Sequence, residues 1–314
     1  MAHPVLDLTG RRNRGEAAFG GLARFAGILV LIVLSLIALV MTTRAWPALT
    51  SGNFFTTKRW SVPDEVFGSL AFVFGTIVSA TVAICLAVPI SIGIALFVTQ
   101  VSPGWLKKPI VYSVDLLATV PSVVFGFWGI SVLAPKIMGF YESVHDLTSG
   151  IPGLRSLFGQ PNGRSMFTAG IILAIMITPI VSSLSREVIS TCPQGDREGA
   201  LALGATRWEM IRAVVIPHSS GGLVGAVMLG LGRAMGETIA ATLVIGSSAQ
   251  ITANLFGAGN SMPAVIASEW GEALGQHRSA LTALAVTLFA LTIIVNVLAT
   301  SIVSRSRRRA QGTI

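Results

Sequence analysis

The chain has 314 residues, of which 52% are hydrophobic and only 11% are charged, and its mean hydropathy is +0.74. A soluble domain carries about 25% charged residues, so this composition excludes a disordered chain and argues against a water-soluble globular enzyme. The net charge of +8 would suit a nucleic-acid partner, but the basic residues are distributed as in a membrane protein, and we expect none.

A helix that crosses a bilayer needs about 20 mostly apolar residues. Six runs with few or no charges reach that length, and charged residues bound most of them. The runs lie between Arg24 and Arg44, Glu65 and Lys107, Asp115 and Lys136, Arg164 and Arg186, after Arg212, and between Arg278 and Arg305. The first run is too long for the core of a signal peptide and is interpreted as a retained helix.

The second run is twice as long as one span requires. It holds either one helix with an interfacial tail, or a hairpin broken near Pro89 and Gly93. With one helix and a cytoplasmic N-terminus, the inside segments carry fourteen Lys and Arg residues and the outside segments carry seven. This asymmetry follows the positive-inside rule. The sequence therefore predicts an all-α membrane protein with six transmembrane helices and both termini in the cytoplasm.

Three regions follow from this topology. Residues 1–66 would hold the cytoplasmic N-terminus, the first transmembrane helix and an outer loop. Residues 67–303 would form the transmembrane domain, with a cytoplasmic loop at about 190–218, and residues 304–314 would form a basic cytoplasmic tail.

The expected outer loops differ in composition. Residues 45–66 and 135–165 are rich in Gly, Pro, Ser and Asn, which favours ordered caps or short helices. The 247–277 stretch is apolar but too short and too broken to span. It is either re-entrant or interfacial, or an apolar loop packed on neighbouring helices.

The cysteine and histidine pattern indicates no cofactor. Cys85 lies in an apolar run and Cys192 in a polar loop, and the four histidines lack the spacing of metal ligands. We expect neither a disulfide framework nor a metal site.

The cytoplasmic loop is amphipathic. Gly204 is expected to divide it into two short helices, and Pro217 to end it and open the next span. The segment Glu198-Gly199-Ala200, three residues, Gly204, nine residues, Val214-Val215-Ile216-Pro217 resembles the EAA loop of ABC importer permeases, whose pattern is E-A-A-x3-G-x9-I-x-L-P. The spacing matches at every anchor, with Gly199, Val214 and Ile216 as mild departures.

In that family the loop forms a coupling helix that docks into a groove on a cytosolic ATPase. The resemblance implies this role for a set of seven residues. They are Glu198, Gly199, Ala200, Gly204, Val214, Ile216 and Pro217. The alternative is an amphipathic loop lying on the membrane surface. The chain contains no Gly-Lys pair and hence no phosphate-binding P-loop, so ATP hydrolysis is expected in a separate subunit and the chain itself is not expected to be an enzyme.

The fifth span carries two charges. If it begins near Ser219, Arg233 lies about 21 Å along the helix, near the middle of the membrane. Glu237 follows one turn later on the same face. Each charge costs about 2.5–3.5 kcal/mol at the centre of the bilayer, so such residues usually line a pathway or pair with each other. The sequence allows a structural salt bridge or an anion site.

An anion site would suit phosphate. Arginine offers planar, bidentate donors to phosphate oxygens. The carboxylate of Glu237 can accept a hydrogen bond from hydrogen phosphate, whereas sulfate has no proton to give. An arginine beside a glutamate therefore favours phosphate over sulfate.

Three segments, Leu116–Gly126, Gly232–Ala240 and Met262–Glu269, resemble the phosphate-specific transport (Pst) permeases. The last segment and the long outer loop resemble the PstC type more than the PstA type, and the likeness extends from about Phe67 to Ala299. It implies an ABC importer permease (MetI-like) fold in a bacterial cytoplasmic membrane, with Arg233, Glu237 and Thr238 on the substrate pathway. It also implies four partner subunits: a PstA-like sister permease, two PstB-like ATP-binding subunits and an extracytoplasmic PstS-like phosphate-binding protein.

The third span has a charge at its start and a proline within it. The family usually has an acid before Leu-Leu-Ala, where Asp115 stands here. Asp115 would pair with a base such as Arg186, or remain an interfacial acid whose side chain reaches water. Pro121 is expected to kink the span midway.

Other functions fit less well. An importer of another oxyanion stays open. A passive anion channel has no need of a docking loop, and a membrane-embedded hydrolase would need a nucleophile and base that we do not find.

Overall fold

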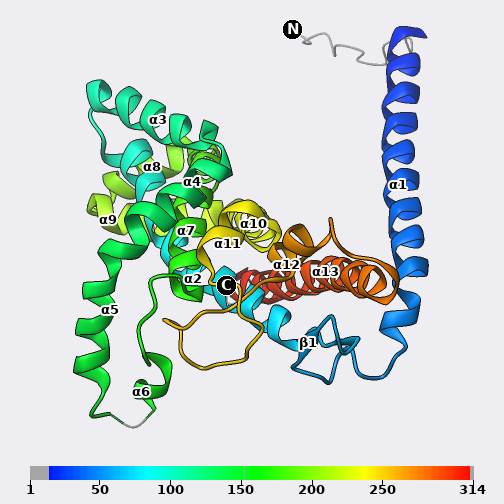
Figure 1. Ribbon diagram of the computed structural model, residues 1–314. Coiled ribbons are helices and arrows are strands. Elements are labelled where there is room, and N and C mark those ends of the chain that lie inside the picture. The colour runs from blue at the N-terminus through cyan, green and yellow to red at the C-terminus, as the bar shows by residue number, and fades with distance from the viewer. Residues whose placement is uncertain (1–13, 152, 312–314) are drawn as a thin grey trace, which may run out of the picture.

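The computed structural model describes residues 14–151 and 153–311, and the side chains of residues 18–151 and 153–301. The first 13 residues of the expected N-terminal region and the last three of the basic tail lie outside the described residues. Apart from one two-stranded hairpin, the described elements are helices (Figure 1). In chain order the elements are α1 (Arg14–Leu49), β1 (Trp60–Ser61), β2 (Val66–Phe67), α2 (Leu70–Leu96), η1 (Phe97–Val101), α3 (Gly104–Thr119), α4 (Ser122–Trp128), η2 (Gly129–Leu133), α5 (Ala134–Thr148), α6 (Leu154–Leu157), α7 (Met166–Ser190), α8 (Gln194–Ala202), α9 (Arg207–Met210), η3 (Ile211–Val215), α10 (Ile216–Gly236), α11 (Ile239–Val244), α12 (Met262–Glu269) and α13 (Gly275–Gln311), where η marks a π-helical turn.

Six helical stretches of the described chain are long and apolar enough to cross a membrane, which confirms the predicted number. The long second run forms a single stretch, Leu70–Val101, so the hairpin alternative is wrong. Its helix continues through Pro89 and Gly93, and only the last turn, η1, widens into π-helical geometry.

The third span starts and ends at different residues than predicted. The helix does not kink at Pro121 but stops: Val120 is extended, with ψ 126°, and α4 begins afresh at Ser122. A proline disfavours helical backbone at the residue before it, which accounts for the break. Lys136 does not end the span either, because helical structure continues through η2 and α5 to Thr148. The apolar stretch long enough to span is thus Ser122–Thr148.

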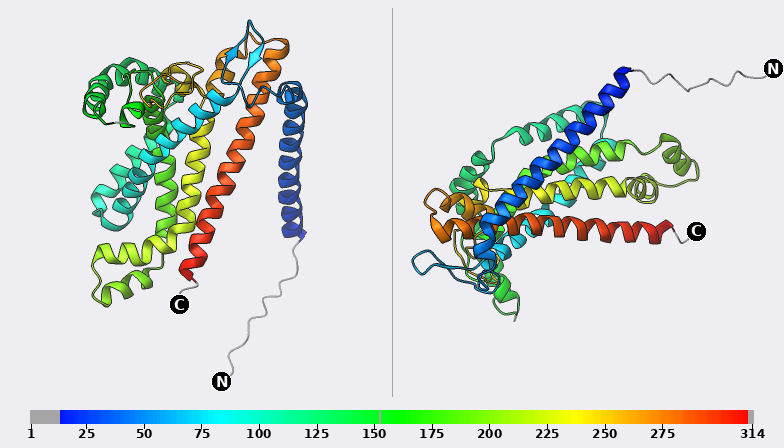
Figure 2. Two further views of the ribbon diagram at one scale, coloured as in Figure 1. Left: turned by 90° about the horizontal axis from the view of Figure 1, so that it is seen from below. Right: turned by 90° about the vertical axis from the view of Figure 1, so that its right-hand side faces the viewer.

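The connecting segments gather at two ends of the bundle. In Figure 2 (left), α8 and α9 lie at the same end as the start of α1 and the end of α13, whereas the β1–β2 hairpin and α12 lie at the opposite end. We call these the coupling end and the hairpin end. The sorting agrees with the predicted topology, which places the two groups of segments on opposite sides of a membrane.

The 247–277 stretch packs on neighbouring helices, and part of it is helical. Ser261 caps the start of α12 by accepting a hydrogen bond from the backbone N–H of Ala264. Met262 is fully buried, and its backbone N–H donates to Thr76 Oγ1 of α2 at 3.0 Å. The apolar residues of this stretch therefore complete the core at the hairpin end, together with α2 and α13.

Hydrogen bonds of Glu269 link the β1–β2 hairpin to that core. Its Oε2 accepts a hydrogen bond from Trp60 Nε1 at 2.9 Å and lies 2.8 Å from His277 Nε2. The His277 ring is stacked on Phe67 with centroids 5.5 Å apart. The expected outer loop 45–66 is thus an ordered cap, tied to the end of α12 and the start of α13.

Two glycines of α10 mark the face of this helix that packs against α7. A Cβ atom at Gly222 would lie 2.4 Å from Val188 of α7, and one at Gly230 would lie 2.5 Å from Val181 of the same helix. Small residues allow such close packing of helices in membranes. Gly225 and Gly232, by contrast, have open space where a side chain would be. The packing against α7 therefore leaves the face of Gly225 and Gly232 uncovered, and Arg233 lines a cleft together with these two glycines.

Candidate coupling and translocation sites

The coupling segment, residues 194–217, turns at Gly204 as predicted. Gly204 has φ +86°, in the left-handed region that disfavours side chains. Its N–H donates to the carbonyl of Leu201, and the N–H of Ala205 donates to the carbonyl of Ala200. These two bonds form a Schellman motif with glycine just past the end of α8. The glycine thus allows two short helices to meet at a fixed turn.

The second helix starts with a capping box. The backbone N–H of Glu209 donates to Thr206 Oγ1, and the carboxylate of Glu209 accepts from the backbone N–H of Thr206 at 2.8 Å. From Arg207 the helix then runs without interruption to Gly236. Pro217 therefore lies near the start of α10, but it does not end the helix that precedes it. The π-helical turn η3 lies directly before it, where the missing N–H of proline removes a helical hydrogen bond.

The apolar residues of the coupling segment form two groups. Met210, Ile211 and Val215 are buried in one cluster with residues of α2, α7 and α10, and Ala200, Val214 and Ile216 pack against that cluster. Leu203 and Trp208 instead point outward, with 92% and 62% of their surface exposed. The inner group joins the segment to the transmembrane helices, while the outer group leaves an apolar surface free for a partner.

Two of the predicted coupling residues remain at the surface of α8. Glu198 is exposed and accepts a hydrogen bond from Gln194 Nε2 at 2.8 Å. Gly199 is also exposed, and a Cβ atom there would meet nothing within 4 Å. Neither residue contributes to the buried cluster, so both are available to an external surface.

The helix that carries Arg233 ends earlier than predicted. The sequence placed Arg233 and Glu237 on one continuous helix, but α10 ends at Gly236 and Glu237 is extended, with ψ 128°. A second short helix, α11, starts at Ile239 after Thr238. Unwound backbone within a membrane protein is tolerated where it is buried in protein or lines a cavity. Arg233 lies in the last turn of α10, where the exposed carbonyl groups favour a positive charge.

Arg233 and Glu237 nevertheless form an ion pair. Arg233 Nη2 lies 3.7 Å from Glu237 Oε2, too far for a good hydrogen bond. The two environments are unequal, because the Glu237 side chain is 8% exposed and that of Arg233 is 50% exposed. No described residue accepts a hydrogen bond from the guanidinium. Arg233 therefore keeps its donors free while a buried carboxylate holds it in place.

Arg233 lies in an open cleft of about 670 Å³ between α10, α7 and α13. The cleft is lined by Ile180, Gly225, Met228, Leu229, Gly232, Arg233, Asn296 and Thr300. Thr238 is not among these residues, and its hydroxyl donates to the carbonyl of Gly236 at 3.3 Å. Asn296 is a cleft residue that was not predicted from the sequence, although a lone carboxamide in an apolar helix is the signal that would have found it.

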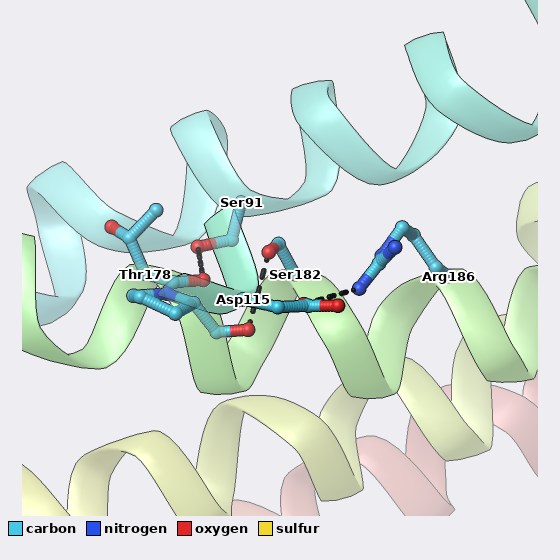
Figure 3. Close-up of polar contacts among 6 residues, drawn as sticks. Ser91, Asp115, Thr178, Ser182 and Arg186 are labelled. Atoms are coloured by element: carbon cyan, nitrogen blue, oxygen red, sulfur yellow. Dashed lines mark hydrogen bonds and ion pairs between the residues drawn. The ribbon is translucent and has the colours of Figure 1, made fainter. Parts of the chain in front are cut away.

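Asp115 and Arg186 lie together, as the sequence suggested. Arg186 Nη2 donates to Asp115 Oδ1 at 2.9 Å and thereby ties α3 to α7 (Figure 3). Ser91 and Ser182 lie beside this pair, and each donates its hydroxyl to a backbone carbonyl of α7. Arg186 Nε is buried without a partner among the described residues. The ion pair is intact although Asp115 belongs to a helix separate from the third span.

We expect the Asp115–Arg186 pair to stabilise the fold modestly. Replacing Asp115 by Asn leaves Arg186, whose side chain is 14% exposed, without its carboxylate. Because Asp115 itself is 48% exposed, the loss should be about 1 kcal/mol, seen as a lower unfolding temperature in detergent. Asp64→Asn is the control: Asp64 is also half exposed, but its partner Arg59 is 69% exposed, so no buried base is left unpaired and the unfolding temperature should fall less. Equal unfolding temperatures for Asp115→Asn and wild type would contradict a stabilising role.

Within the described parts of the chain, no three His, Cys, Asp or Glu side chains gather closely enough to hold a metal ion.

Comparison with known proteins identifies the family. Residues 87–308 match the family of binding-protein-dependent transport system inner membrane components. The chain belongs to this family. It is thus the membrane-spanning permease of an ABC transporter and is not catalytic, since a separate subunit of such transporters carries the ATPase.

Curated relatives match over nearly the whole chain. The phosphate transport system permease protein PstC of Haemophilus influenzae is 40% identical over 93% of this chain and 94% of its own length. PstC of Mesorhizobium japonicum is 41% identical over 89% of this chain and 87% of its own length. PstC 2 of Mycobacterium tuberculosis is 42% identical over 92% of both chains.

Solved structures support the fold alone. A bacterial ABC transporter that imports the acidic polysaccharide alginate matches 92% of this chain and 99% of its own, with a TM-score of 0.55 and 15% identity. The MetNI methionine ABC transporter, in an inward-facing conformation, matches 80% of this chain and 99% of its own, with a TM-score of 0.52 and 16% identity. The predicted ABC importer permease fold is confirmed.

Proposed function

We propose that this chain is the permease subunit of an ATP-driven importer of inorganic phosphate. The observation that carries the proposal is the Arg233–Glu237 pair. The half-exposed guanidinium of Arg233 lines a cleft with its donors free, and the buried carboxylate of Glu237 lies 3.7 Å from it. Relatives with about 40% identity are named phosphate transport permeases, which supports phosphate as the substrate.

The proposed mechanism is alternating access. Binding of ATP closes the groove between the partner ATPases and moves the coupling segment. Because Met210, Ile211 and Val215 are buried against the transmembrane helices, this movement is transmitted to α10. Arg233 is then exposed to one side of the membrane at a time, and phosphate passes along the open face of α10.

The partners follow from the surfaces that the chain leaves uncovered. Leu203 and Trp208 would contact a PstB-like ATP-binding subunit, of which the complex would hold two copies. The uncovered face of α10, with Gly225 and Gly232, would face a PstA-like sister permease across the pathway. A PstS-like binding protein would deliver phosphate at the hairpin end.

Opposite accessibility of the two ends tests the topology. In a chain without Cys85 and Cys192, a single cysteine at Leu203 should react with an impermeant maleimide only after the cells are permeabilised, because the coupling end is predicted to be cytoplasmic. A cysteine at Leu147, which is also exposed, should react on intact spheroplasts. The chain is expressed without partners so that no subunit covers Leu203. Labelling of both positions on intact spheroplasts would contradict the proposed orientation.

Uptake by membrane vesicles tests the substrate. The assembled complex should import radiolabelled phosphate when ATP is supplied, and unlabelled phosphate should compete far better than sulfate or molybdate. Preferred uptake of sulfate or molybdate would favour the alternative of an importer for another oxyanion. Phosphate flux without ATP would favour a passive channel.

A further inference from the structure

Asn296 differs from the threonines of α13 in having no hydrogen-bond partner for its side chain among the described residues. Thr282, Thr287, Thr292 and Thr300 each donate a hydrogen bond of 2.8 Å to the carbonyl four residues earlier. Such bonds satisfy hydroxyl groups inside an apolar helix. Asn296 is the single carboxamide between Arg278 and Ser301, and no described residue forms a hydrogen bond with its side chain. An unsatisfied amide facing lipid is costly, so Asn296 requires a polar environment.

The cleft that holds Arg233 provides that environment. Asn296 and Thr300 line the cleft from α13, while Arg233 and Gly225 line it from α10. The two helices run in opposite directions (Figure 2), so the order of residues along one is reversed along the other. Thr300 therefore lies with Gly225 towards the coupling end, and Asn296 lies between Thr300 and the level of Arg233. Asn296 is thus placed on the route from Arg233 to the coupling end.

The carboxamide of Asn296 suits a protonated oxyanion. Its NH2 group donates to phosphate oxygens, and its carbonyl accepts from the one oxygen of hydrogen phosphate that carries a proton. It does so without adding charge, so it would hold the anion less tightly than Arg233. Transport requires that an ion binds strongly enough to enter a pathway and weakly enough to leave it. A neutral, weaker contact after a charged one would help the anion to leave.

We propose that Asn296 is a second contact for the transported anion, between Arg233 and the coupling end of the pathway. The proposal rests on the proposed function, because it assumes that the cleft carries the substrate.

Substitution of Asn296 is the first test. Asn296→Asp keeps the shape and adds a negative charge, which should lower phosphate uptake per assembled complex about tenfold or more because like charges repel. Thr287→Val on the same helix, at a position satisfied by its own backbone and outside the cleft, should leave uptake unchanged. Wild-type uptake by Asn296→Asp would overturn the proposal.

Thiol chemistry provides a second measurement that does not depend on the assembly of Asn296→Asp. In a complex without Cys85 and Cys192, Asn296→Cys should react with an anionic methanethiosulfonate in inverted vesicles, and inorganic phosphate should slow the reaction. Leu298→Cys is the control, because Leu298 is 58% exposed but lies outside the cleft and should stay unreactive. Equal reactivity at the two positions, or a reaction that phosphate does not slow, would overturn the proposal.

The two proposals fail in different ways. If wild-type vesicles take up another oxyanion in place of phosphate, and that oxyanion slows the reaction of Asn296→Cys, the substrate assignment is wrong and the second contact stands. If vesicles with wild-type protein and vesicles with Asn296→Asp import phosphate equally well, the proposed function stands and the proposal of a second contact at Asn296 is wrong.

Discussion

Simultaneous replacement of Arg233 and Glu237 by glutamine is expected to abolish phosphate uptake while the complex still assembles. The double variant removes both charges together, so no buried charge is left unpaired. Arg233→Gln and Glu237→Gln both keep the approximate size of the side chains. If the cleft binds phosphate through Arg233, loss of the guanidinium removes its main attraction for an anion. The measurement is radiolabelled phosphate uptake, divided by the amount of assembled complex.

The single variants are expected to differ. Arg233→Gln leaves Glu237, which is only 8% exposed, without its counter-ion, so this variant should lower the amount of assembled complex. Glu237→Gln leaves Arg233 with half of its surface open to the cleft, so the fold should tolerate it better. This second variant should weaken the preference for phosphate over sulfate, because the acceptor for the phosphate proton is lost. Near wild-type uptake by the double variant would instead identify the pair as a structural salt bridge.

The number of spans could be predicted because charges are costly within a bilayer. Arg164 and Arg186, for example, bracket a charge-free run that largely coincides with α7. The same reasoning misplaced the third span. Lys136 falls inside the continuous helical stretch from Ser122 to Thr148, so the charge does not mark the helix end. The break instead comes at Val120, where the following proline restricts the backbone.

The residues of the site could be named from the sequence, but their geometry could not. The i, i+4 spacing of Arg233 and Glu237 predicted neighbouring charges on a helix, and the ion pair exists although the helix ends between them. The unwinding at Glu237 depends on how α10 and α11 pack against other helices, and the residues around Glu237 did not lead us to predict it. The unequal exposure of the two side chains likewise depends on tertiary packing, and so does the meeting of Arg233 with Asn296 in one cleft.

The coupling segment offers the second large effect. Gly204→Val is expected to stop ATP-driven uptake while the protein still inserts into the membrane. Nothing lies within 4 Å of a Cβ atom at Gly204, so the effect does not come from a clash with neighbouring residues. It comes from the backbone: φ is +86°, and a residue with a side chain is disfavoured there by roughly 1–2 kcal/mol, more for a β-branched one. The Schellman bonds of Leu201 and Ala200 would be lost with the turn.

Two matched variants separate this backbone effect from the effect of added bulk. Gly195→Val adds the same side chain to α8, also in open space but without a positive φ, and it precedes the Glu198–Pro217 pattern, so this variant should transport normally. Gly204→Asn should retain part of the uptake, because asparagine tolerates left-handed backbone better than valine does. Binding of the ATPase subunit should fall in the order wild type, Gly204→Asn, Gly204→Val, since Leu203 and Trp208 lie on either side of the turn and keep their relative placement only while it is intact. Normal uptake by Gly204→Val would mean that the angle between α8 and α9 does not matter for docking, and the coupling role of the segment would have to be abandoned.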